Sequence, residues 1–175
     1  MAGKKTGKGG NTVAAVYKLA KPIADSLGLK IWDITFDKEG SLRYLRVFIE
    51  KDGGAVDMDD CEAMTRPLSK ALDEADPIDE QYMLEVGSPG LGRELRKEEH
   101  FLEYLDCPLR IRYIREKDGI KEFIAVLTAY NKENGSITVE TEKGTEEIAV
   151  SDTAFIKLFD DEELPDEFFD DDIEQ

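Results

Sequence analysis

The amino-acid sequence predicts an α+β protein made of two small domains, an N-terminal α-β-β-α-β domain and a C-terminal β-barrel. Apolar residues in the first half repeat first with helical and then with strand spacing. Four or five short strand-like runs follow in the second half. Between the halves, residues 84–93 combine three glycines with a proline, a mixture that specifies a bend.

Two helices are expected in the first domain. Thr12 is suited to cap the first helix, and Gly28 is suited to end it. Asp57 begins the second helix. Pro22 and Pro67 lie inside these patterns and are expected to kink or shorten the helices.

Three strands complete the first domain, at residues 29–36, 42–49 and 82–86. The first two flank a Lys-Glu-Gly turn and therefore predict a hairpin. In the first strand the apolar residues change parity between Ile31 and Trp32. The order of elements predicts two layers, with both helices covering one face of a small sheet.

The second domain is expected to begin with a short helical turn at residues 98–105. The strand-like runs then cover residues 109–115, 120–130, 136–141, 145–150 and 154–158. Asp-Gly, Asn-Gly and Lys-Gly pairs separate successive runs and predict hairpins, and short strands at this spacing favour a small closed barrel.

Composition and charge bound the function. We divide the 175 residues into a disordered basic leader (1–10), the N-terminal domain (11–92), the C-terminal domain (93–159) and a disordered acidic tail (160–175). A net charge of −17 argues against indiscriminate nucleic-acid binding through the overall field. Two cysteines form no disulfide framework, and no apolar run could span a membrane. The chain is expected to be cytoplasmic and monomeric.

No residue pattern predicts an enzyme, a metal site or a cofactor. His100 is the single histidine, on a charged turn, and no P-loop, nucleophile elbow or zinc motif occurs. Asp57, Asp59 and Asp60 could suggest a metal cluster, but carboxylates at a helix N-terminus are expected for capping. A carboxylate-based hydrolase stays a rival hypothesis because the chain has 40 acidic residues.

The GxxG string Gly87-Ser88-Pro89-Gly90 matches the loop of KH domains, which contacts RNA. Here it follows a strand and contains a proline, so we interpret it as an interdomain turn. Ser88, Pro89, Gly90 and Leu91 are the predicted joint, in which Pro89 and a buried Leu91 fix the angle between the domains.

Basic residues gather after the joint. On a strand, Arg110 and Arg112 share one face, which is typical both of a solvated face and of one that contacts phosphate. The candidate binding residues are Arg93, Arg110, Arg112, Arg115, Lys117 and Lys121. The tail carries ten carboxylates, which either keep the protein soluble or, with apolar residues between them, dock on a basic surface.

The run Tyr82-x-Leu84-Glu85-Val86-Gly87-Ser88-Pro89-Gly90-Leu91-x-Arg93 closely resembles the signature of the bacterial ribosome maturation factor RimP family. The resemblance covers residues 12–159 and extends to the second helix and to Phe101 and Pro108. The chain departs from the family at Gly87, Gly92 and Glu94, where serine, aspartate and proline are usual.

The resemblance implies an SH3-like (Sm-like) C-terminal barrel and a non-enzymatic factor that binds free, immature small (30S) ribosomal subunits. It also implies contact with a ribosomal protein near the decoding region and with rRNA, and no cofactor, membrane or small-molecule substrate. The alternative is an acidic adaptor whose barrel binds proteins and never contacts the ribosome.

Overall fold

Residues 8–160 are described by a computed structural model, and they divide into two units, one ending at Pro89 and the other starting at Gly90. The first unit holds α1 (Lys8–Ser26), β1 (Leu29–Glu39), β2 (Leu42–Lys51), α2 (Met58–Ala75) and β3 (Met83–Gly87). The second holds α3 (Glu98–Glu103), β4 (Pro108–Lys117), β5 (Ile120–Asn131), β6 (Ser136–Thr141), β7 (Gly144–Ala149), the 3-10 helix η1 (Val150–Asp152) and β8 (Thr153–Leu158). The predicted α+β class is confirmed.

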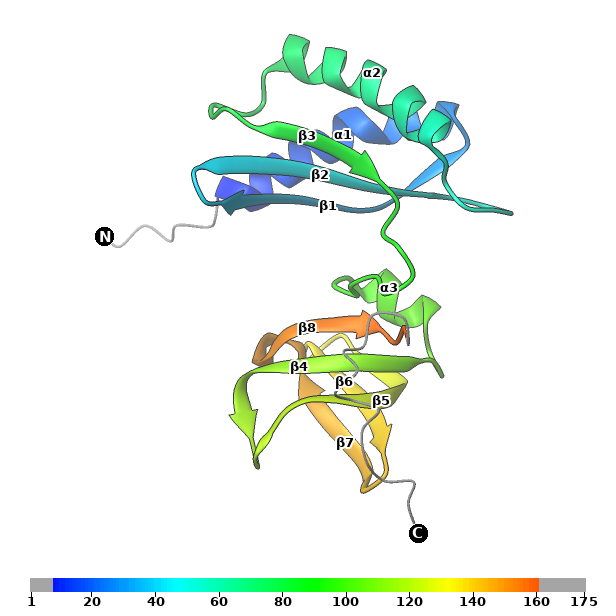
Figure 1. The fold of residues 1–175 in the computed structure, drawn as a ribbon, viewed down its shortest axis with the longest axis vertical. Helices are drawn as coiled ribbons and strands as arrows, with labels where there is room; N and C mark the ends of the chain where they lie inside the picture. The colour runs from blue at the N-terminus through cyan, green and yellow to red at the C-terminus, as the bar shows by residue number, and fades with distance from the viewer. Residues whose placement is uncertain (1–7, 161–175) are drawn as a thin grey trace, which may run out of the picture. The chain divides into compact units, whose positions relative to one another are not determined.

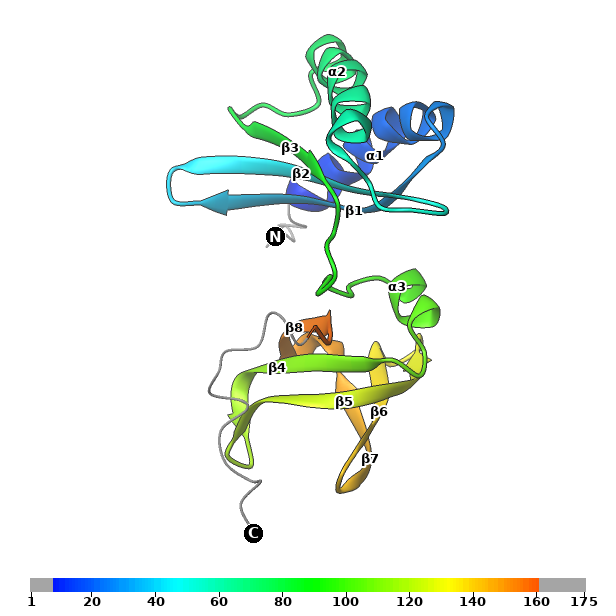
Figure 2. The ribbon, with the colours of Figure 1, turned by 45° about the vertical axis from the view of Figure 1, so that its right-hand side comes forward.

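The first unit is a three-stranded sheet in the order β1-β2-β3, with α1 and α2 on one face (Figures 1 and 2). β1 and β2 form the predicted antiparallel hairpin. β3 runs parallel to β2, which is possible because α2 provides the long crossover connection that parallel strands require. Residues from both layers form one core: Val16, Ala20, Ala24, Leu29, Ile34, Leu45, Val47, Ile49, Met64, Leu68, Leu72 and Ile78.

A β-bulge in β1 accounts for the parity change seen in the sequence. The pairing with β2 shifts register between Ile31 and Asp33, so Trp32 is the extra residue. Ile31 packs against the core from one side of the bulge, and Ile34 does so from the other. The bulge therefore lets apolar residues of both parities face the helices.

The first helix starts earlier than predicted. α1 begins at Lys8, so Thr12 lies within the helix and does not cap it. The leader predicted for residues 1–10 is wrong for residues 8–10, because the helix propagates back through Gly9 and Gly10. The rest of the leader, and the acidic tail after Asp160, lie outside the described residues.

Both helices continue through their prolines, contrary to expectation. Pro22 and Pro67 are exposed, and so are Lys18 and Ala63, the residues four positions earlier. The carbonyls that lack a helical N–H partner thus lie on the solvent side, where water can satisfy them. The apolar faces of the helices are left intact.

The second helix begins with a complete capping box. The Asp60 N–H donates to Asp57 Oδ1 at 2.8 Å, and the Asp57 N–H donates to Asp60 Oδ2 at 3.1 Å. Lys51 Nζ of β2 also lies 2.7 Å from Asp60 Oδ2. The Lys51 ammonium and the Asp57 N–H hold the pKa of Asp60 below its usual value. The capping interpretation of these carboxylates is confirmed.

The second unit is one antiparallel sheet in the order β7-β6-β5-β4-β8. The predicted hairpins at Gly119, Gly135 and Gly144 are confirmed, and each glycine has a positive φ. All five strands contribute to one core, so the sheet curls around it (Figure 2). Within residues 8–160 no ladder joins β7 to β8. Closure into an SH3-like barrel therefore stays a prediction.

The core of the second unit is completed by residues that precede the sheet. Leu95 and Phe101 are buried, and the Phe101 ring stacks on Tyr130 of β5 with centroids 4.9 Å apart. α3 is thereby anchored to the sheet by an aromatic pair. None of the helices in the described part of the chain is long and apolar enough to cross a membrane.

Candidate functional site

The predicted joint is short because its first residue is part of the first unit and its last residues are part of the second. Gly87 pairs with Phe48 as the last residue of β3. At the other end, the Leu158 N–H donates to the Arg93 carbonyl at 3.0 Å, and the Leu95 N–H donates to the Ile156 carbonyl at 2.7 Å. Residues 93–95 thus pair with β8, at the edge of the second sheet. Only residues 88–92 connect the two units.

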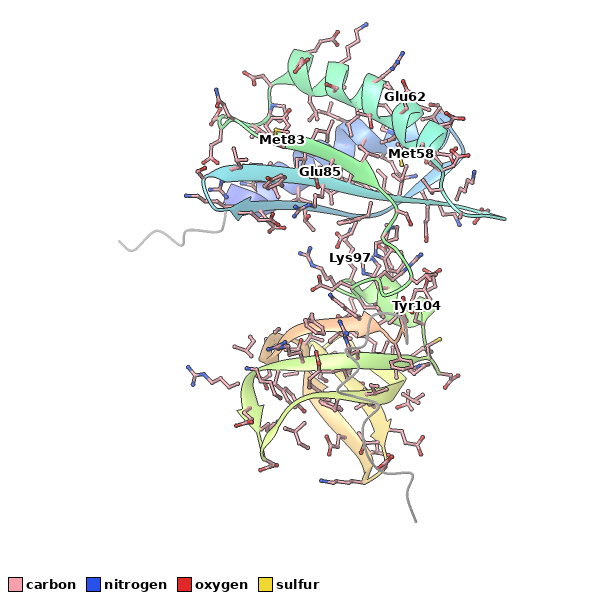
Figure 3. All side chains as sticks on the ribbon, viewed as in Figure 1. Met58, Glu62, Met83, Glu85, Lys97 and Tyr104 are labelled. Carbon is pink, nitrogen blue, oxygen red and sulfur yellow. The ribbon has the colours of Figure 1, made fainter. Side chains whose placement is uncertain are left out.

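Leu91, expected to be buried, is 73% exposed, so this expectation is wrong. The turn is held by polar contacts instead. Gly90 has a φ of 81°, a conformation that glycine adopts without strain. The Arg93 guanidinium donates from Nε to the Gly90 carbonyl at 3.0 Å and from Nη1 to the Tyr104 hydroxyl at 3.2 Å. Tyr104 is labelled in Figure 3 at the end of α3.

Arg93 therefore has a structural role in the second unit. Its guanidinium bridges the turn and α3, and it lies 6.0 Å from the Tyr104 ring centroid. Two of the N–H groups of its guanidinium donate to acceptors inside the chain. This makes Arg93 a weaker candidate for ligand contact than the sequence pattern indicated.

The outward side of β4, β5 and β8 brings cations and apolar groups together. We name it the basic face and define it by Arg110 and Arg112 of β4, Ile124 of β5, and Phe155 and Lys157 of β8. Across the strands, Arg110 is paired with both Ile124 and Lys157, and Arg112 is paired with Phe155. Residues paired in this way stand side by side on one face of a sheet.

Phe155 organises the cations of the basic face. The Arg110 guanidinium carbon lies 5.2 Å from the Phe155 ring centroid, and Lys157 Nζ lies 4.7 Å from it. Two cations over one aromatic ring are held in place by its negative π-face and by contact with its apolar surface. The face therefore presents two positioned charges around a partly exposed ring.

The two arginines of the face differ in exposure. Arg110 Nε lies 4.0 Å from Glu122 Oε1, and their side chains are only 14% and 18% exposed. Arg112 is an exposed residue, directly across from Glu122 in the ladder. Ile124 is 39% exposed beside them. Arg110 is thus preorganised, whereas Arg112 is available for ionic contact with a ligand.

The remaining predicted basic residues lie toward the tip of the β4–β5 hairpin. Lys121 Nζ donates to the Ile114 carbonyl at 2.7 Å, which ties the hairpin together. Arg115 and Lys117 line a shallow hollow of 400 Å³ beside Asp152. The structure therefore brings Arg110 and Arg112 together on one face but places Arg115, Lys117 and Lys121 elsewhere.

A wider groove of 520 Å³ opens at the same end of the unit, between the β4–β5 and β6–β7 hairpins. Tyr113 and Phe123 form its aromatic wall, with centroids 5.4 Å apart. Burial raises the pKa of the Tyr113 hydroxyl, and the nearby carboxylates, Glu146 foremost, raise it further. The lining carries four carboxylates, Asp118, Glu142, Glu146 and Glu147, against two lysines, so this groove is acidic, in contrast to the basic face.

His100 is buried and acts as a hydrogen-bond acceptor. His100 is 2% exposed, and its Nδ1 accepts the backbone N–H groups of Arg96 (2.9 Å) and Lys97 (3.2 Å). It caps the start of α3 from inside the core. Over residues 8–160, no group of three or more histidine, cysteine or carboxylate side chains is arranged to hold a metal ion.

Sequence reasoning missed Phe155 and Lys157 because they lie 43 or more positions from Arg112 in the chain. A signal for them was present. Ile156 between them is buried in the core, and strand alternation places its two neighbours on the outer side. What the sequence did not show is which strand pairs with β4.

A comparison with protein families assigns the first unit. Residues 19–92 match the family model described as the RimP N-terminal domain. The first unit is therefore similar to the RimP N-terminal domain over most of its length. The matched residues run from within α1 through β3 to the end of the connection between the units. The second unit, with its basic face, lies almost wholly beyond the matched residues.

Proposed function

We propose that this protein is a non-enzymatic ribosome maturation factor that binds free, immature small (30S) ribosomal subunits in the cytoplasm. The observation that carries the proposal is the match of residues 19–92 to the RimP N-terminal domain. The signature run of residues 82–93, which resembles the same family, supports it.

The basic face is the proposed contact with the particle. Phosphate groups dominate the surface of rRNA, and exposed arginines that are held in register bind them well. Arg112 and Lys157 supply the charges, and Ile124 and Phe155 supply apolar area for a ribosomal protein at the same site. In this proposal Arg115 and Lys117 make peripheral contacts.

Binding assists maturation without a chemical step. A factor that has higher affinity for one conformation of a maturing site shifts the population toward that conformation. Residues 88–92 connect two units that, in our proposal, contact one particle together, so the second contact benefits from a high effective concentration. Ser88, Pro89, Gly90 and Leu91 then limit the separation of the two units, which act within a monomer.

Sedimentation of a cell lysate tests this function. At low salt, the tagged full chain is expected to comigrate with free small subunits and to be depleted from whole ribosomes. Cells that lack the protein are expected to accumulate small-subunit precursors. If the protein stays entirely in the particle-free fractions and precursors do not accumulate, the maturation role is wrong, and the adaptor alternative gains support.

A further inference from the structure

The basic face is a cationic and apolar surface on a strongly acidic chain. Arg110, Arg112 and Lys157 stand against two carboxylates in the pairing, Glu122 across from Arg112 and Glu94 across from Lys157. Val126, the next outward residue after Ile124 on β5, is 36% exposed and is paired with Glu140 of β6. A segment that complements this surface must carry carboxylates and large apolar side chains together.

Residues 161–175 have this composition. They contain nine carboxylates and neither lysine nor arginine. Among the carboxylates stand four large apolar residues, Leu164, Phe168, Phe169 and Ile173. A sequence that served only to keep the protein soluble would not need adjacent phenylalanines, since exposed aromatic residues lower solubility.

The chain leaves the described region beside the face. The Phe159 N–H donates to the Pro108 carbonyl at 3.0 Å, next to the start of β4. Lys157 is three residues before Asp160 in sequence and is paired with Arg110 across the strands. An extended chain covers about 3.3 Å per residue, so the segment after Asp160 is long enough to reach every residue of the face.

We infer that residues 161–175 bind the basic face of the same molecule and shield it from other anions. The carboxylates contact Arg112 and Lys157, and Phe168 and Phe169 pack on Ile124 and Val126. An RNA that contacts only the basic face must compete with this segment and therefore binds weakly. A particle that contacts both units gains additional binding energy and displaces the segment more easily. The shielding is independent of the proposed function, which enters only in naming the particle that displaces the segment.

The expected strength follows from the tether. A short flexible connection gives an effective concentration of about 1 mM. If the free segment binds with a dissociation constant of about 0.1 mM, the tethered segment occupies the face about nine-tenths of the time and weakens competing anions about tenfold. Salt screens such contacts, so the shielding is expected to fade as salt is raised.

The first test compares two full-length chains. In one, every Asp and Glu of residues 161–175 is replaced by Asn or Gln, which keeps the length and the apolar residues. Binding of a short fluorescein-labelled oligouridylate is measured by anisotropy over a salt series. The neutral-tail chain is expected to bind about tenfold more tightly at low salt, with the difference vanishing at high salt. Equal affinity at low salt would overturn the inference.

The second test locates the contact. Backbone amide spectra of the two chains are expected to differ at residues 110–112 and 155–157, and a peptide of residues 161–175 added to the neutral-tail chain should restore the wild-type positions. The variant Arg112→Glu, Lys157→Glu should abolish the peptide effect, whereas Arg66→Glu, at an 80% exposed side chain on α2, should leave it unchanged. Spectral differences confined to the residues next to Asp160 would contradict the inference.

Residues 161–175 could instead bind the basic face of a second copy of the chain. The dependence of the spectra on protein concentration distinguishes this from binding within one molecule. Within one molecule, the spectral difference is independent of protein concentration. A difference that appears only as concentration is raised, together with sedimentation as a dimer, would overturn the intramolecular contact. Small-subunit binding can succeed or fail in either case, so failure of this inference is distinguishable from failure of the proposed function.

Discussion

The backbone N–H of Leu158 donates to the carbonyl of Arg93 at 3.0 Å, and this bond joins the first residues of the second unit to its last strand. Glu94 and Lys157 form an isolated antiparallel bridge at the same place. The entering chain therefore covers part of the edge of β8, which would otherwise offer unpaired backbone groups to another strand. It also supports the strand that carries Phe155 and Lys157.

Replacement of Leu95 is expected to destabilise the second unit. Leu95 is 2% exposed and belongs to the core, so Leu95→Ala should lower the free energy of unfolding of this unit by about 2–5 kcal/mol. Hydrogen exchange of the full chain would show faster exchange in β4 and β8. Leu91→Ala is the control, since Leu91 is 73% exposed and its loss should change stability by less than about 0.5 kcal/mol. Equal effects of the two substitutions would contradict the assignment of Leu95 to the core.

His100 is expected to act as a buried acceptor and not as a catalyst. His100→Phe removes the Nδ1 acceptor of two backbone N–H groups and should cost about 1–3 kcal/mol. His100→Asn offers a side-chain oxygen near the same position and should lose less. Urea unfolding followed by hydrogen exchange at α3 measures both. If phenylalanine is tolerated as well as asparagine, the capping role is wrong.

The capping box predicts a pH dependence in the first unit. The folded-state pKa of Asp60 is lowered, foremost by Lys51, so its contribution is present above the unfolded pKa and is lost as pH falls through the folded pKa. Unfolding midpoints in urea, measured from about pH 7 down to about pH 3, should therefore fall more steeply for the wild type than for Asp60→Asn. Parallel pH profiles for the two proteins would show that the ionised carboxylate does not contribute.

Most helices and strands could be predicted from the sequence because their turns and apolar spacing depend on residues close together in the chain. Glycine turns at 119, 135 and 144 specify hairpins. The parity change at Trp32 was visible in the sequence, but only the pairing with β2 identifies it as a bulge. The start of α1 at Lys8 was missed because glycines are poor helix formers, and packing of the following apolar face overrides that preference.

The candidate site was only half visible in the sequence. Arg110 and Arg112 could be placed on one strand face by alternation alone. Phe155 and Lys157 join them through the pairing of β4 with β8, which depends on the whole sheet. The exposure of Leu91 was also unpredictable, because composition gives no account of whether an apolar turn residue has a surface to pack on.

The most direct measurement is the affinity of the purified protein for purified immature small subunits. It compares the wild type with Arg110→Ala, Arg112→Ala, Lys157→Ala combined, over a salt series. As a control, Lys21→Ala, Lys30→Ala, Arg66→Ala removes the same charge from exposed ion pairs of the first unit. We expect the basic-face variant to bind at least about tenfold more weakly and with a shallower salt dependence, and the control to bind nearly as the wild type. Unchanged affinity and salt dependence of the basic-face variant would contradict the assignment of this face as the particle-binding site.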